Sequence, residues 1–115
     1  MILESGEPER LYTGLSLLVS AASNGEPARG LATFGALRAL ADPAEPTLVI
    51  EAELPAFKAT LAELKAAAGE LPECRIWACS AAAQATGAPV AAPLEGVLSM
   101  PTFLRETAGA RLVVV

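Results

Sequence analysis

The order of apolar and polar residues predicts that strands alternate with helices along the chain. Short apolar runs bounded by turn residues indicate strands, and apolar residues recurring every three or four positions indicate amphipathic helices. The predicted strands cover residues 1–4, 29–34, 75–79, 96–100 and 111–115. The first predicted helix has Pro8 in its first turn and stops at Asn24-Gly25, and the others cover residues 36–41, 54–71, 80–86 and 101–106. Residues 47–51 also have the composition of a strand, but the pattern does not place them in a sheet.

The first long helix has the clearest signals. Pro8 stands where a first-turn proline belongs, and Asn24-Gly25 is a stop signal because both residues tolerate the left-handed backbone that ends helices. Between them, four apolar residues recur at helical spacing: Leu11, Leu15, Leu18 and Ala22. The second long helix has a similar stripe, formed by Phe57, Leu61, Leu64, Ala68 and Leu71.

This alternation predicts an α/β fold with a mostly parallel sheet of about five strands, covered by helices on both faces. A length of 115 residues is typical of one compact domain, and the sequence has no repeat or linker. We therefore expect a single domain over residues 1–115.

Composition excludes several functions. Net charge is −5 and aromatic residues are only 4%, which disfavours nucleic-acid binding. The sequence has no histidine, which excludes a Ser-His-Asp triad and histidine metal ligands, and its two cysteines do not form a CxxC pair. We therefore expect no metal and no cofactor.

The same composition bears on location and assembly. No apolar run is long enough to cross a bilayer, and MILESGEPER does not have a signal-peptide pattern, so a cytoplasmic protein is expected. Hydrophobic residues make up 53% of this small chain. That surplus of apolar side chains predicts a homo-oligomer.

The main candidate for chemistry is Cys79. It stands between the predicted strand 75–79 and the predicted helix 80–86, which stops at Gly87. Free N–H groups and the positive dipole end at a helix start favour a thiolate over a thiol. Ser80 is the expected N-cap because serine is preferred there. The alternative is that Cys79 is a small apolar core residue, the usual role of a free cysteine.

Further binding candidates follow from the sheet. Ligands of parallel α/β sheets bind outside the carboxyl ends of the strands, where the turns after the predicted strands should meet. The run of alanines from Ala81 to Ala83 would let a ligand approach the helix start, and it fits tight packing of that helix on the sheet equally well. The predicted binding residues are Ser5, Gly6, Gly35, Ser80 and Ala81.

Cys74 is not expected to form a disulfide with Cys79. Five residues of extended chain would separate them by about 16 Å and point their side chains to opposite faces, whereas a disulfide needs α-carbons within about 7 Å. Cys74 is therefore predicted to be structural. Trp77 shares the strand face of Cys79, and we expect it to pack in the core.

The sequence resembles the DsrE/DsrF-like sulfur-relay family. The similarity is carried by WACSAAAQATGA, followed by PLEGVLSM, PTFLRETAG and a closing apolar strand, and by SGEPERLYTGLSLLVSAA in the first half. The resemblance implies a three-layer α/β/α sandwich that assembles as a trimer or hexamer. It also implies that Cys79 accepts a persulfide from a donor protein and passes the sulfur to an acceptor.

Two functions are therefore open. The first is a persulfide sulfur carrier that acts through Cys79. The second is a non-catalytic module for small-ligand binding or assembly, in which Cys79 is structural. A thiol peroxidase is disfavoured because the chain offers no resolving cysteine or histidine base.

Overall fold

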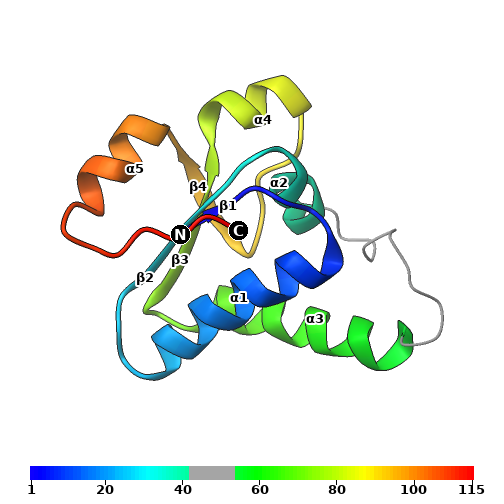
Figure 1. Ribbon diagram of the computed structural model, residues 1–115. Helices are drawn as coiled ribbons and strands as arrows, with labels where there is room; N and C mark the ends of the chain where they lie inside the picture. The colour runs from blue at the N-terminus through cyan, green and yellow to red at the C-terminus, as the bar shows by residue number, and fades with distance from the viewer. Residues whose placement is uncertain (42–53) are drawn as a thin grey trace.

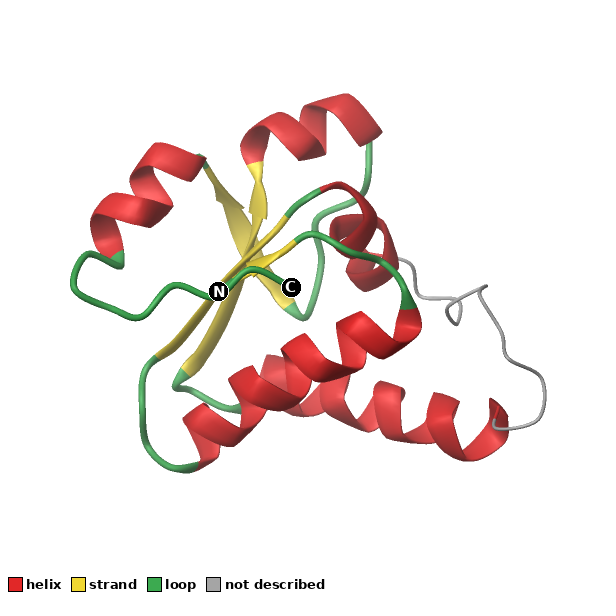
Figure 2. Ribbon diagram, viewed as in Figure 1, coloured by secondary structure: helices red, strands yellow, loops and turns green. Residues whose placement is uncertain are grey.

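A computed structural model describes residues 1–41 and 54–115. In these residues the chain forms an α/β fold around a four-stranded parallel sheet, in the order β1-β2-β3-β4 (Figures 1 and 2). The strands are β1 (Ile2–Leu3), β2 (Ala28–Ala32), β3 (Cys74–Cys79) and β4 (Leu94–Leu98). The helices described are α1 (Pro8–Ser23), α2 (Phe34–Ala41), α3 (Leu54–Glu70), α4 (Ser80–Thr86) and α5 (Met100–Glu106). The predicted fold class is confirmed.

The helices lie on both sides of the sheet. α1 packs along α3, and both contact β3, whereas α5 lies across the strands from them in Figure 1. α2 contacts α4. This arrangement is compatible with a three-layer α/β/α sandwich.

Side chains of both long helices, α1 and α3, belong to the buried core. Every residue of the apolar stripe predicted for α1 is buried, and so are Leu61 and Ala68 of α3. Tyr12 of α1 and Phe57 of α3 pack together, with their ring centroids 5.7 Å apart. Burying a leucine side chain contributes about 1.5–3 kcal/mol. The helical periodicity of the sequence therefore reflects these buried contacts.

β2 and β4 each end two residues earlier than predicted. β2 ends at Ala32 and α2 already begins at Phe34, because the chain turns where the amides of Thr33 and Ala36 donate to the carbonyls of Leu3 and Glu4, respectively. β4 covers Leu94–Leu98 instead of residues 96–100. The chain leaves the sheet there because Ser99 caps α5, its Oγ accepting from the amide of Thr102 at 3.3 Å.

The predicted last strand is reduced to one bridge. Val114 pairs in parallel with Ile2, and the Ile2 amide donates to the Val113 carbonyl at 2.7 Å. β1 has only two residues and offers few groups for pairing, so the sheet has four strands and a bridge instead of five strands. The predicted segment 47–51 lies outside the described residues. Among the described helices, none combines the length and the apolar character that a membrane span requires.

Candidate functional site

Cys79 lies at the carboxyl end of β3, and α4 begins at the next residue. This strand-to-helix junction and the end of α4 at Gly87, which has a φ of 66°, agree with the sequence prediction. The N-cap does not. Cys79 has extended backbone angles (φ −64°, ψ 126°) and is itself the N-cap, because Ser80 already belongs to the helix. The thiol is thus attached to the residue that joins strand and helix.

The environment of Cys79 is largely apolar. Only 7% of the residue is exposed, and it belongs to the buried core cluster. Its side chain caps no amide of α4, and its backbone pairs with Leu98 of β4. The alanines that follow are unequal: Ala82 is buried, whereas Ala81 is exposed. A reagent therefore has only a small area through which to reach the sulfur.

The turns after β1 and β2 touch each other. A Cβ placed on Gly35 would lie 2.8 Å from the Gly6 nitrogen, and one placed on Gly6 would meet the Gly35 carbonyl group. The absence of side chains at both positions allows this approach. The Ser5 side chain already has a local hydrogen-bond partner, because its Oγ accepts from the Glu7 amide at 3.1 Å.

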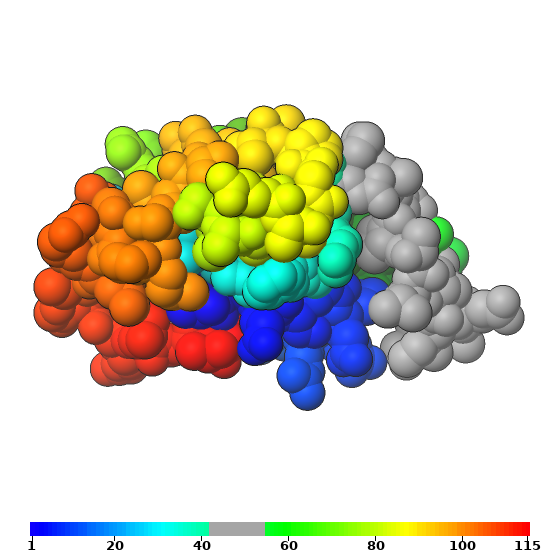
Figure 3. Space-filling view, turned by 90° about the horizontal axis from the view of Figure 1, so that it is seen from above, coloured from blue at the N-terminus to red at the C-terminus, as the bar shows by residue number. Residues whose placement is uncertain are grey.

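The predicted binding residues therefore form two groups. Gly6 and Gly35 are in contact, whereas Ser80 and Ala81 follow Cys79 in α4. β2 separates β1 from β3, which places the turn after β1 about 10 Å from the end of β3. In Figure 3, α4 (yellow-green) lies between the segment that includes α2 (cyan) and α5 (orange), across the middle of this edge. The five residues share one edge of the sheet, where Gly35 follows β2, the strand between β1 and β3.

Sequence reasoning missed the conformation of Phe34. This residue has a φ of +34° and is 51% exposed, at the start of α2. A positive φ is costly for a bulky side chain, and an exposed aromatic gains little from burial. The sequence does not predict a positive φ at this position, because glycine and asparagine are the residues that usually adopt one.

Cys74 is the second thiol and lies at the other end of β3. It is buried and, like Cys79, free. Burial raises the pKa of the Cys74 thiol, and the nearby Glu95 raises it further, while Arg29 opposes the shift. Because one strand contains both cysteines at its two ends, they are too far apart for a disulfide, as the sequence predicts. These features fit the predicted structural role of Cys74.

Trp77 is partly buried and packs against the core cluster, as expected. Across residues 1–41 and 54–115, no group of three or more histidine, cysteine, aspartate or glutamate residues could hold a metal ion.

No protein-family model matches the chain, and a search of the curated proteins finds no match. The resemblance to sulfur-relay proteins therefore stays a hypothesis.

Proposed function

We propose that this protein is a cytoplasmic sulfur carrier that holds a persulfide on Cys79. The observation that supports it is the position of a free thiol at the carboxyl end of a parallel strand, directly before a helix. Ligands of parallel α/β sheets bind at that edge. The first amides of α4 lack partners within the helix and can stabilise a thiolate.

The transfer has two steps. The Cys79 thiolate attacks the outer sulfur of a donor persulfide, R–S–SH, which forms Cys79–S–SH and releases the donor as R–S⁻. An acceptor thiolate, R′–S⁻, then attacks the outer sulfur of Cys79–S–SH, which forms R′–S–SH and regenerates the Cys79 thiolate. No net oxidation occurs, so the protein needs no redox cofactor. The donor and acceptor are proposed to be proteins, and the carrier to be a homo-oligomer, a trimer or hexamer.

The experiment measures sulfur on the intact protein. The purified chain is treated with a persulfide donor, excess reagent is removed, and the mass is measured. We expect wild type and Cys74→Ser to gain one sulfur atom, and Cys79→Ser to gain none. Cys74→Ser is the matched control because both thiols are buried and lie in the same strand. Equal labelling of Cys79→Ser and wild type would contradict the assignment.

The burial of Cys79 favours a second candidate, a non-catalytic ligand-binding or assembly module in which this residue is structural. In that case the folded protein gains no sulfur, and an alkylating reagent modifies Cys79 only after the chain unfolds. Alkylation with and without denaturant separates the two functions, because a carrier reacts while folded. Sedimentation at several concentrations measures the oligomeric state independently.

A further inference from the structure

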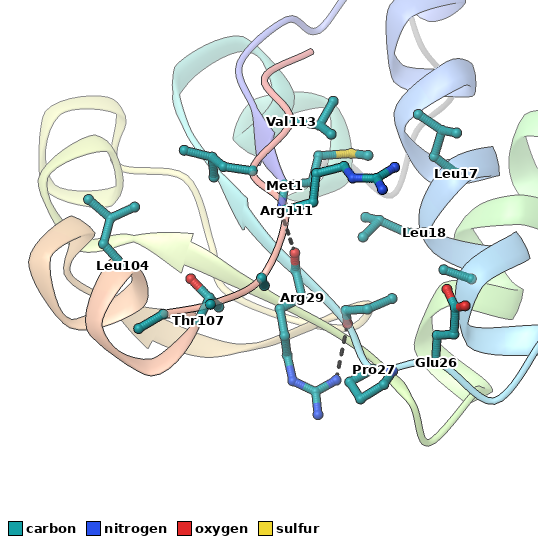
Figure 4. Close-up of a pocket in the computed structure, with 16 residues that line it drawn as sticks. Met1, Leu17, Leu18, Glu26, Pro27, Arg29, Leu104, Thr107, Arg111 and Val113 are labelled. Carbon is teal, nitrogen blue, oxygen red and sulfur yellow. Dashed lines mark hydrogen bonds between the residues drawn. The ribbon is translucent and has the colours of Figure 1, made fainter.

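A cavity of about 630 Å³ opens at the end of the molecule away from Cys79. Its walls come from the second half of α1, from the residues that lead into β2 and from the segment that follows α5 (Figure 4). β2 begins there, so the cavity lies at the amino edge of the sheet, whereas Cys79 lies at the carboxyl edge. Its volume is within the range of about 300–1,000 Å³ typical of small-molecule sites.

Apolar side chains that would otherwise be exposed to water line this cavity. Seven large hydrophobic residues in the described part of the chain are exposed, and three of them line it: Leu17, Leu104 and Leu112. Leu18 adds a buried wall. Exposed apolar side chains that gather around one hollow mark a binding site more often than single ones scattered over a surface.

Two arginines also line the cavity, Arg29 and Arg111. Arg29 is held in place by backbone carbonyls, its Nη1 donating to Glu73 at 2.7 Å and to Ala28 at 3.2 Å. Neither arginine forms an ion pair with any carboxylate of residues 1–41 and 54–115, although the protein has a net charge of −5. Among the described residues that line the cavity, Glu26 alone has a carboxylate side chain. Two guanidinium groups against one carboxylate leave the described lining with an excess of positive charge.

The two guanidinium groups have different positions. In Figure 4, Arg111 extends toward Leu17 and Leu18 on α1, whereas Arg29 extends away from them, toward Pro27. Arg111 is thus the cation that stands beside the apolar wall. A guanidinium binds a carboxylate through two parallel hydrogen bonds, which favours a ligand with a carboxylate head.

We propose that this cavity binds a monocarboxylate with an apolar body, whose head pairs with Arg111 and whose body packs on Leu17 and Leu18. Arg29 adds positive potential without contacting the head. Glu26 disfavours ligands that carry a second negative charge. The site is separate from Cys79 and independent of the proposed sulfur transfer.

The test uses three eight-carbon probes, octanoate, octanol and octylammonium, added to the ¹⁵N-labelled protein and followed by amide chemical shifts. We expect octanoate to bind at least ten-fold more tightly than either of the others, with shifts centred on residues 17–21 and 107–113. Arg111→Gln should weaken octanoate binding by roughly ten-fold, the loss expected for a hydrogen bond to a charged group, and leave octanol unchanged. Leu17→Ser should weaken both.

Arg10→Gln is the matched control, because it also removes one arginine charge but at a position in α1 outside the cavity, where Arg10 pairs with Glu7 at 3.7 Å. It should bind octanoate like wild type. Equal affinity for octanol and octanoate would overturn the proposal, as would unchanged binding by Arg111→Gln or shifts confined to other surfaces. If sedimentation shows a dimer that covers residues 107–113 and octanoate does not bind, a second copy occupies the site and the proposal is wrong.

Discussion

The contact between Gly6 and Gly35 gives the sharpest test of the fold. A Cβ added at Gly6 would meet the carbonyl carbon of Gly35 at 2.8 Å, closer than real Cβ atoms come to such atoms. The clashing atoms belong to the backbone, so the clash cannot be relieved by a change of side-chain rotamer. Gly6→Ala must push the turn after β1 away from the turn after β2. Overpacking of this kind costs about 1–3 kcal/mol.

A glycine-to-alanine change at Gly69 should instead raise the free energy of unfolding. Gly69 lies in α3, where a new Cβ would have ordinary contacts with Pro93, the nearest at 3.4 Å. Replacing a helical glycine by alanine stabilises by about 0.5–1 kcal/mol. Gly69→Ala is therefore the matched control for the addition of one methyl group.

Thermal unfolding measures both effects. With about 2.1 cal/mol/K per residue over 115 residues, the entropy of unfolding is about 0.24 kcal/mol/K. A loss of 2 kcal/mol then lowers Tm by about 8 °C, and a gain of 0.5 kcal/mol raises it by about 2 °C. If Gly6→Ala melts at or above the wild-type temperature, the close approach of the two turns does not exist in solution.

Two further predictions concern Cys74 and Phe34. Because the pKa of Cys74 is raised in the folded state, the unfolded chain loses its thiol proton first; the stabilisation is complete below pH 9.0, the ordinary thiol value, and is lost as pH rises above it. The free energy of unfolding, measured by urea titration from pH 8 to 10.5, should fall more steeply for wild type than for Cys74→Ala, with slopes that differ by at most about 1.4 kcal/mol per pH unit. Parallel curves would contradict a raised pKa of Cys74. Phe34→Gly should raise the free energy of unfolding by about 1 kcal/mol, because glycine adopts a φ of +34° without steric cost and little packing is lost at an exposed position. A lower urea midpoint for Phe34→Gly would show that the aromatic ring has a stabilising contact.

Much of the fold follows from local patterns. The stripe that includes Leu15 predicts α1 because a helix buries one face, and the β3–α4 junction at Cys79 is visible where an apolar strand gives way to small helix formers. The end of β2 is not predictable in this way. Its position depends on hydrogen bonds to β1, and Phe34 does not have the residue type that marks a positive φ.

The candidate site is predictable only in part. The topology of a parallel sheet places Gly6, Gly35 and Cys79 at one edge, and sequence reasoning reaches that far. Sequence reasoning does not predict the direct contact between the two glycines or the burial of Cys79 at 7% exposure. Both depend on how the turns and α4 pack against the sheet. The cavity is further out of reach, because Arg29 and Arg111 stand far apart in the chain and in segments that show no shared pattern.

The pairing of Ile2 with Val114 has a consequence for the order of folding. β1 is flanked by β2 on one side and by a segment 112 residues later on the other. During synthesis from the amino end, β1 can pair with β2 early, but its outer edge stays open until residues 113–115 have been made. Contacts that join such distant segments form late, since a large loop must close first. A truncated or slowly completed chain therefore exposes an unpaired strand edge, the kind of surface through which partly folded chains aggregate.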